Sequence, residues 1–214
     1  MEKKHKLAAV VLCIAAVCTI GIIAIKNNSK EELVSKQGSA LSSPTDRVVI
    51  AGDKEYVVGE DGFEPGYYDV STKEPVKTNA FKLGSNQTIL NIRYYNRNKI
   101  SLSQGSSVIM TRSKFEPLKF NDDIAVLNNT TGAFRCGEEI EAGTYEVSVE
   151  GKHKNAEIFF QVEMKTENKW EAMDMAQVKN KKSAVLKIQG NEYINIVNFY
   201  PEYGDFKIYI KKVE

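Results

Sequence analysis

Aromatic side chains are the residues of this chain whose type and spacing best suit a binding site. Phe159, Trp170, Tyr200 and Tyr203 do not all fit a simple alternation of buried and exposed strand positions. An exposed aromatic ring on a sheet can stack on a sugar or anchor a protein partner. We therefore expect these four residues to form a binding surface. The alternative is that they pack beneath loops.

Catalytic motifs are missing from the sequence. His5 and His153 are the two histidines, and they are too far apart in the chain to suggest a shared metal. The motifs of phosphate-binding loops, dinucleotide sites, zinc proteases and nucleophilic serines do not occur. Glu138, Glu139 and Glu141 could form a carboxylate pair, but they flank a turn, which favours a solvated surface. We expect no enzymatic activity, no catalytic residue, no metal and no cofactor; a carboxylate-dependent hydrolase is the least favoured alternative.

The N-terminal segment predicts where the protein works. Leu7–Ile25 is an uncharged apolar run of 19 residues. As a helix it would extend roughly 28 Å, close to the bilayer's hydrocarbon thickness of about 30 Å. Lysines at positions 3, 4 and 6 precede it, which favours a cytoplasmic N-terminus. We expect a signal-anchor helix that crosses the cell membrane once, with the C-terminal domains outside the cytoplasm.

Two other interpretations of this segment remain open. A cleaved secretory signal would end in small residues spaced A-x-A, and only Thr19–Gly21 and Gly38–Ala40 approach that pattern. A lipoprotein signal would modify Cys13 or Cys18, but neither follows the expected leucine and small residue. Under the anchor interpretation the cytoplasmic tail is too short to form a domain, so the protein acts outside the cytoplasm.

Charge and cysteine content narrow the choice of partners. Residues 1–30 contain five lysines and one glutamate, which leaves 24 basic and 27 acidic residues in the rest of the chain. This mixed surface lacks the dense basic face that neutralises phosphates, so we expect no nucleic-acid partner. Cys136 is the one cysteine beyond the apolar run, so no disulfide can form within the exported part. It is either a small buried hydrophobe or a thiol that links two chains.

Beyond the apolar run, the pattern is that of a mainly β protein. Short stretches rich in β-branched and aromatic residues are separated every 8 to 12 residues by Gly, Pro or Asn, as in a β-sandwich. Only Trp170–Lys179 hints at a helix. We expect two tandem small β-sandwich-like domains after the transmembrane helix. The expected segments are a cytoplasmic tail (1–6), the helix (7–25), a flexible stalk (26–47), a first β module (48–120), a linker (121–130) and a second β module (131–214).

Two parts of the sequence resemble each other. An aromatic residue and a glycine are followed by a hydrophobe-Glu-small-Gly-x-Tyr-acid-Val block, beginning at Tyr56 and again at Phe134, at an offset of 77 to 78. A Gln-Gly pair at Gln104 and Gln189 gives a second match at an offset of 85, which a longer middle hairpin in the second copy would explain. Ordered matches of this kind indicate an internal duplication.

The shared residues are explained by folding. Glu-Pro-Gly and Glu-Ala-Gly suit tight turns in which glycine supplies a positive φ, and each Tyr then begins a strand. We therefore assign structural roles in turns to the glycines and tyrosines of the two copies. These residues are Gly59, Gly66, Tyr68, Gly105, Gly137, Gly143, Tyr145 and Gly190.

The repeated block resembles a small β-rich module of exported, lipid- or helix-anchored surface proteins of Gram-positive bacteria. The second copy fits that pattern better, and the first departs from it through Pro65 and an inserted Gly62. The resemblance implies location and fold but no chemistry. We expect a non-enzymatic binding or assembly module that acts through protein contacts at the cell surface. The alternative is a cell-wall or carbohydrate-binding module, so the partners would be the membrane, through Leu7–Ile25, and a protein or a cell-wall glycan.

Overall fold

The computed structural model describes residues 47–213, except residues 53, 61 and 168. The expected cytoplasmic tail, the expected membrane helix at 7–25 and nearly all of the expected stalk lie outside this range. No helix within the described range is long and apolar enough to cross a membrane. The described part is mainly β, as predicted, and its helical structure is one short 3-10 turn, η2 (Pro201–Tyr203).

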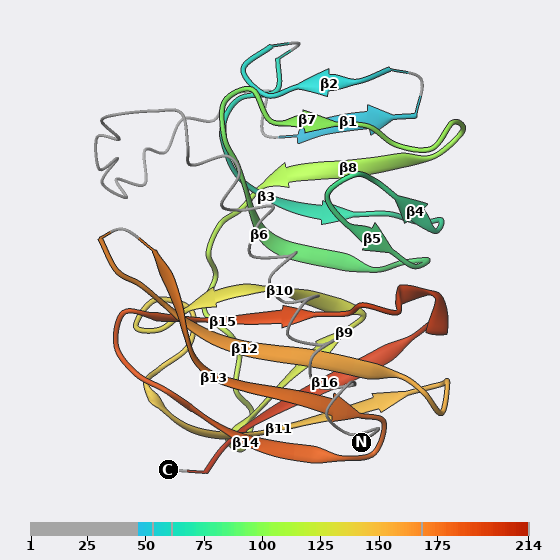
Figure 1. Cartoon of the computed structure of the whole chain (residues 1–214). Coiled ribbons are helices and arrows are strands. Elements are labelled where there is room, and N and C mark those ends of the chain that lie inside the picture. Colours follow the sequence, from blue (N-terminus) through green and yellow to red (C-terminus); the bar gives the residue numbers. More distant parts are fainter. Residues whose placement is uncertain (1–46, 53, 61, 168, 214) are drawn as a thin grey trace, which may run out of the picture. The chain divides into compact units, whose positions relative to one another are not determined.

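Strands fill two successive stretches of the chain, here called the first half and the second half (Figure 1). The first half contains β1 (Arg47–Ala51), β2 (Tyr56–Val57), β3 (Gly66–Ser71), β4 (Val76–Lys77), β5 (Lys82–Leu83), β6 (Thr88–Tyr94), β7 (Lys99–Ile100) and β8 (Ser107–Arg112). The second half contains β9 (Ile124–Asn128), β10 (Thr130–Arg135), β11 (Gly143–Gly151), β12 (Glu157–Lys165), β13 (Trp170–Lys179), β14 (Ser183–Ile188), β15 (Glu192–Val197) and β16 (Phe206–Lys212).

The strands of the two halves pair in the same order. In the first half the sheet order is β1-β8-β3-β6, and in the second half β9-β16-β11-β14, with every neighbouring pair antiparallel. The remaining strands also correspond, because β2 pairs with β7 as β10 pairs with β15, and β4 pairs with β5 as β12 pairs with β13. Each half thus uses eight strands in one shared pairing scheme.

One sheet runs through both halves. The order β1-β8-β3-β6-β10-β15-β12-β13 joins the two halves where β6 pairs in parallel with β10. Gly132 permits this pairing, because a Cβ at Gly132 would lie 2.5 Å from the backbone oxygen of Leu90. Its φ of +146° also disfavours other residues. The two halves are therefore joined edge to edge by backbone hydrogen bonds.

A bulge in β6 lets this strand serve two hydrophobic cores. Leu90 and Asn91 stand opposite the single residue Asp69, and Asn91 has a φ of +61°. The bulge turns Leu90 toward the core of the second half, whereas Ile89 and Ile92 pack against the core of the first. The Asp69 carboxylate accepts the backbone N–H of Asn91, at 3.0 Å, so the bulge leaves this amide satisfied.

Buried polar groups also connect the two halves. The Asn91 side-chain amide donates to the backbone oxygen of Ala133, at 2.8 Å, and to Glu139 Oε1, at 2.6 Å. The other oxygen of Glu139 accepts the backbone N–H of Arg135, at 3.1 Å. Since Glu139 is only 4% exposed, these donors compensate for the cost of burying its carboxylate.

The tyrosines of the repeated block are core residues with identical roles. Tyr68 and Tyr145 are almost fully buried, and each donates its hydroxyl proton to a backbone oxygen four residues earlier, at Glu64 (2.7 Å) and Glu141 (2.8 Å). This is the hydrogen bond of a tyrosine corner. The same glutamates form ion pairs with the last residue of the strand next to each tyrosine, Glu64 with Arg112 of β8 and Glu141 with Lys212 of β16.

The glycines expected in turns divide into two groups. Gly59, Gly105 and Gly137 have φ values of +95°, +79° and +83°, and the amides of Gly59 and Gly137 close corresponding turns by donating to Phe63 and Ile140. Gly66 has a φ of +151° and a side chain there would collide with Arg112. Among the described residues, Gly143 and Gly190 are not in the positive-φ group, and Gly143 begins β11 as an ordinary strand residue.

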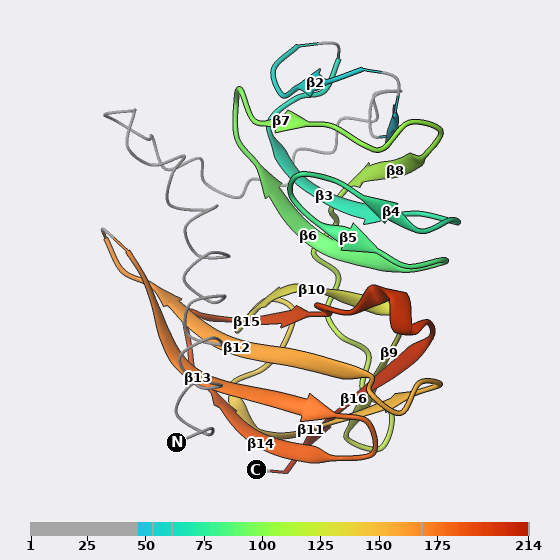
Figure 2. The same cartoon turned by 45° about the vertical axis from the view of Figure 1, so that its right-hand side comes forward.

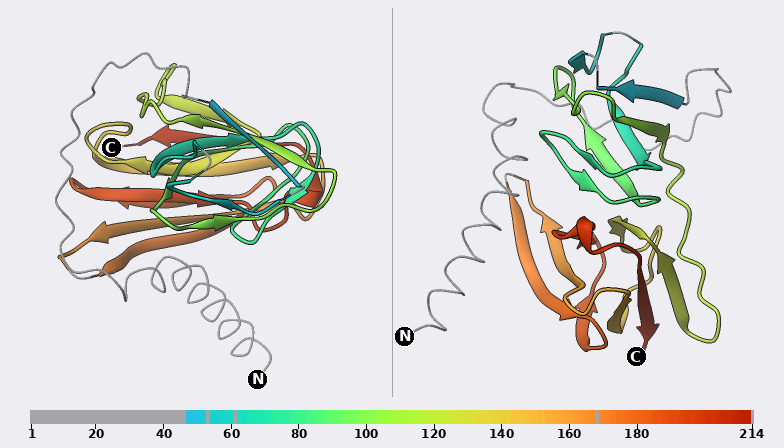
Figure 3. Two further views of the ribbon diagram at one scale, coloured as in Figure 1. Left: turned by 90° about the horizontal axis from the view of Figure 1, so that it is seen from above. Right: turned by 90° about the vertical axis from the view of Figure 1, so that its right-hand side faces the viewer.

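Three expectations need correction. Trp170–Lys179 is the strand β13 and not a helix, because it pairs with β12 along its length. The range 121–130, expected as a linker, contains β9, and the connection between the halves is instead the extended segment 113–123 (Figure 3). The two Gln-Gly pairs do not correspond, because the strand after Gln104 is β8 whereas the strand after Gln189 is β15, which matches β7.

Candidate functional site

The second half contains three connections that are longer than those of the first. In the β4–β5 hairpin of the first half, Thr78 and Phe81 close the turn, and they correspond to Phe160 and Ala176 of the second half. The second half therefore has residues 161–175 where the first half has only residues 79–80. Residues 198–205 likewise replace Gln104 and Gly105 between the last two strands. The β11–β12 turn is also longer than the β3–β4 turn. We call the strand arrangement common to both halves the shared frame. The first half forms this frame without the added residues, so these residues are candidates for function.

The longest addition forms the outer part of the β12–β13 hairpin, whose tip projects beyond β15 (Figure 2). Trp170, at the start of β13, is 38% exposed and meets Tyr193 of β15 edge to face, with ring centroids 5.2 Å apart. The guanidinium of Arg135 lies 5.7 Å from the Tyr193 ring, and the Lys165 ammonium lies 6.0 Å from the Trp170 ring. Aromatic rings and cations therefore lie together over four neighbouring strands, β10, β15, β12 and β13.

A half-buried carboxylate lies beside this aromatic pair. Glu163 stands opposite Tyr193 in the sheet and accepts amide protons from Gln161 (2.7 Å) and Asn195 (2.7 Å), one on each oxygen. Burial raises the pKa of Glu163, and the hydrogen bond from Asn195 opposes that rise. We call the set Arg135, Gln161, Glu163, Trp170, Tyr193 and Asn195 the hairpin face.

A second group of rings extends this arrangement into the first half. Arg93 of β6 stands opposite Tyr67 of β3, and its guanidinium lies 5.5 Å from the Tyr67 ring and 4.4 Å from the Tyr95 ring. Burial raises the pKa of Tyr193, and Arg135 and Arg93 both lower it, so Arg93 is electrostatically close to the hairpin face. Tyrosine and arginine side chains thus continue across the β6–β10 junction.

The aromatic stack is a separate feature at the opposite end of β12. Tyr203 of η2 lies nearly parallel to His153, with centroids 4.4 Å apart, and nearly parallel to Tyr200, with centroids 5.4 Å apart. His153 belongs to the lengthened β11–β12 turn, and both tyrosines belong to residues 198–205. We call these three rings the aromatic stack. Tyr200 is 42% exposed.

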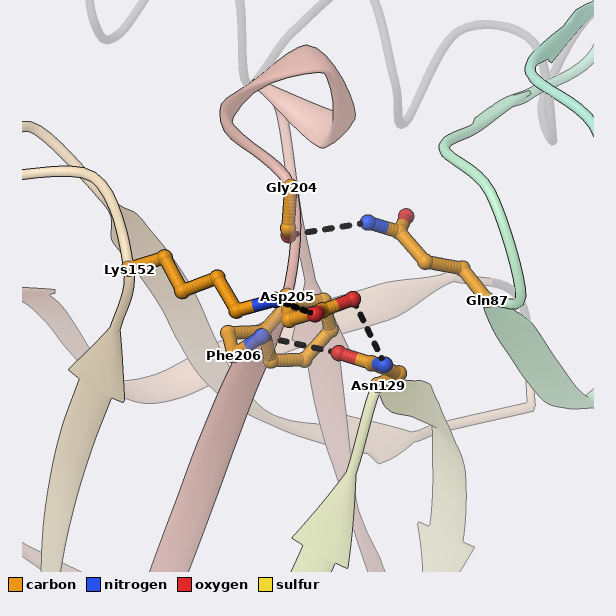
Figure 4. Close-up of polar contacts among 6 residues, drawn as sticks. All are labelled: Gln87, Asn129, Lys152, Gly204, Asp205 and Phe206. Atoms are coloured by element: carbon orange, nitrogen blue, oxygen red, sulfur yellow. Dashed lines mark hydrogen bonds and ion pairs between the residues drawn. The ribbon is translucent and has the colours of Figure 1, made fainter.

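Hydrogen bonds hold the base of the stack in place (Figure 4). The Gln87 side-chain amide, from the first half, donates to the backbone oxygens of Pro201 (3.2 Å) and Gly204 (3.3 Å). Asn129 donates to Asp205 (3.1 Å) and accepts the backbone N–H of Phe206 (2.8 Å). An ion pair between Lys152 and Asp205 ties the two lengthened loops to each other.

A hollow of about 350 Å³ adjoins this base. It is lined by Asn128, Asn129, Glu150, Gly151, Lys152, Asp205, Phe206 and Lys207. Its two lysines balance its two acids, so the hollow has no excess of either charge. Lys152 precedes His153 directly, and Asp205 is two residues from Tyr203, so the hollow and the aromatic stack are neighbours along both loops.

The four aromatic residues expected to bind a ligand lie in different places. Trp170 belongs to the hairpin face, and Tyr200 and Tyr203 belong to the aromatic stack. Phe159 is only 6% exposed and packs against Phe199, so it lies below the surface and is not available to a ligand.

Cys136 is buried, as expected for a small buried hydrophobe, and burial raises the pKa of its thiol.

Sequence reasoning missed most of the residues around Trp170. Gln161 and Glu163 occupy the polar positions of an alternating strand, which is the pattern of a solvated face. Tyr193 and Arg135 lie in strands far away in the sequence, and their proximity depends on the order β10-β15-β12-β13. The signal that could have found them is the length of the second hairpin, since extra residues beyond the shared frame have to be placed on its surface.

Within the part of the chain that the structure describes, no group of three or more His, Cys, Asp or Glu side chains could hold a metal ion. Comparison with protein-family models and with curated proteins found no match for this chain.

Proposed function

We propose that this protein is a membrane-anchored, non-enzymatic binding module that engages a protein partner outside the cytoplasm through the hairpin face. The apolar run Leu7–Ile25 supports the location, with the N-terminus in the cytoplasm. The proposed architecture is a pair of tandem β-sandwich-like repeats that arose by duplication and joined edge to edge. The shared strand order and the paired tyrosine corners support this history.

One observation carries the functional proposal: the residues added to the second repeat bring Trp170 against Tyr193, and the guanidinium of Arg135 lies beside the same tyrosine ring on an outward strand face. Tryptophan, tyrosine and arginine are the residues that most often dominate the energy of protein interfaces. Trp170 is 38% exposed, and its ring lies against Tyr193 and near the Lys165 ammonium. Glu163 and its two amide partners add hydrogen-bonding groups beside the rings.

The hairpin face also favours binding over catalysis. Both oxygens of Glu163 are already held by amide groups, and a hydrolase would need a second carboxylate across from it. Two further acids near this face are buried: Glu139 binds groups at the junction between the repeats, and Glu192 accepts the backbone N–H of Gln189. The proposed role of these acids is therefore to position neighbouring side chains.

Chemical crosslinking in intact cells tests the proposal. The full-length protein is isolated after crosslinking, and its adducts are identified by mass spectrometry for the wild type, Trp170→Ala and the control Val185→Ala. Val185 is 62% exposed on β14, away from the hairpin face. We expect one protein adduct that is retained in Val185→Ala and at least 10-fold weaker in Trp170→Ala, with both variants folded. Equal adducts in both variants would refute the hairpin face as the contact.

A further inference from the structure

We propose that the aromatic stack and its adjoining hollow form a second binding site, for an uncharged pyranose polysaccharide. The site is independent of the hairpin face, since it lies in different loops and at the other end of β12. It uses three rings that the proposed protein contact leaves unexplained.

The first argument is that the fold does not need the stack. The first repeat joins its last two strands with Gln104 and Gly105 alone, whereas the second uses residues 198–205. The β11–β12 turn, which supplies His153, is lengthened as well. Two separate additions therefore meet at one place and bring aromatic rings into contact with each other. Surface loops that exceed the needs of the frame are where proteins usually place binding residues.

The second argument is that hydrogen bonds hold the two loops that carry the stack. The His153 Nδ1 accepts the backbone N–H of Asn155, at 3.2 Å, which orients the imidazole. Asn180 donates to the backbone oxygens of Gly151 and His153, each at 3.0 Å, which fixes the turn. The backbone N–H of Tyr200 donates to Asn198 Oδ1, at 2.9 Å. A platform that is ordered before binding loses little conformational entropy when a ligand arrives.

The third argument concerns the chemistry of the ligand. The C–H face of a pyranose ring is apolar and stacks on an aromatic ring, while its hydroxyls require donors and acceptors at the edge. The stack supplies the ring through the exposed Tyr200, and the hollow supplies both kinds of polar group. Asp205 is bound to Asn129 and Lys152, and Glu150 accepts the Tyr209 hydroxyl proton. A sugar hydroxyl would therefore use the remaining lone pairs of these two carboxylates and the remaining protons of Lys152 and Lys207. Because these charges balance, the hollow favours neither a polyanion nor a polycation.

Sedimentation with insoluble polysaccharides tests the site. The full-length protein, kept in mild detergent, is mixed with particles of chitin, cellulose or insoluble β-glucan, and the bound fraction is measured against particle concentration. The variants are Tyr200→Ala, the aromatic replacement Tyr200→Phe, and the control Trp170→Ala. The melting temperature of each variant is recorded, because a folded variant is needed for the comparison.

We expect the wild type to bind at least one of the three polysaccharides. Tyr200→Ala should weaken that binding on the order of 10-fold, since one stacking ring is lost. Tyr200→Phe and Trp170→Ala should retain it. The proposal is overturned if the wild type binds none of the particles, if Tyr200→Ala binds as well as the wild type, or if Trp170→Ala loses binding to the same extent. If the wild type sediments with a polysaccharide but gives no protein adduct in cells, or if Trp170→Ala gives the same adduct as the wild type, the proposed function alone is refuted.

Discussion

At the scale of single residues, the two buried tyrosine corners should contribute equally to stability. Tyr68→Phe and Tyr145→Phe each remove a hydroxyl that donates to a backbone oxygen, so each should lower the free energy of unfolding by about 1 kcal/mol. Urea denaturation of the full chain measures both. A loss in one variant and none in the other would show that the two positions are not equivalent.

Tyr94 is the matched control for those substitutions. Its hydroxyl is buried and, among the described residues, has no hydrogen-bond partner, and burial strongly raises its pKa. The corresponding position in the second repeat, Ile188, has no hydroxyl. Tyr94→Phe should therefore leave the free energy of unfolding unchanged or raise it by about 1 kcal/mol, because an unsatisfied polar group is removed. A loss as large as that of Tyr68→Phe would contradict this account.

The buried carboxylate of Glu163 makes stability depend on pH. Its pKa in the folded chain is raised above the ordinary value of 4.5, so the folded state binds this proton more tightly than the unfolded state. Its contribution to stability is thus present below pH 4.5 and is lost as pH rises through the folded pKa. Glu163→Gln removes this titration.

Unfolding measured between pH 4 and pH 7 should therefore show the wild type losing stability relative to Glu163→Gln as pH increases. Glu171→Gln, an ion-paired neighbour of Lys169 at the hairpin, controls for a general effect of charge. Parallel pH profiles for the wild type and Glu163→Gln would mean that Glu163 has an ordinary pKa.

At the scale of elements, the parallel pairing of β6 with β10 depends on one glycine. A methyl group at position 132 would meet Leu90 backbone atoms at 2.5 and 2.8 Å, and the residue's φ of +146° suits glycine. Gly132→Ala should lower the free energy of unfolding by about 2 kcal/mol or more. Gly105→Ala is a useful control, because its φ is also positive but nothing lies within 4 Å of its Cβ position. If both substitutions cost the same, the close approach to β6 contributes nothing.

Some strands could be predicted from the sequence, whereas the pairing of distant strands could not. The repeated Gly-x-Tyr-x-Val block predicted the strands β3 and β11, because turn residues and alternating apolar residues act locally. The Gln-Gly match failed because the residues added to the second repeat shift the later strands by different amounts. The sequence of β13 only hinted at a helix, since its exposed Met173 and Met175 break the alternation of a half-buried strand. The parallel β6–β10 junction depends on Gly132 and on a bulge at Asn91, and neither has a recognisable local pattern.

At the scale of the whole molecule, the two repeats share a frame and differ in what they add to it. The first repeat closes its hairpin and its last turn with two residues each, and the second places Trp170, Tyr200 and Tyr203 on additions to the same frame. The second repeat therefore carries the proposed contacts, and the first repeat supports them. Gln87 shows this support directly, since its side chain belongs to the first repeat and holds the base of the aromatic stack.

Site-directed photocrosslinking tests the central claim, that the protein binds its partner through the hairpin face, most directly. A photoreactive phenylalanine is placed in the full-length protein at Met175, which is 48% exposed on β13, or at Val49, which is 53% exposed on β1. After irradiation of intact cells, position 175 should give a discrete protein adduct that disappears when Trp170→Ala is added, and position 49 should give none. An adduct of equal yield at both positions, or one at position 175 that persists without Trp170, would contradict the account.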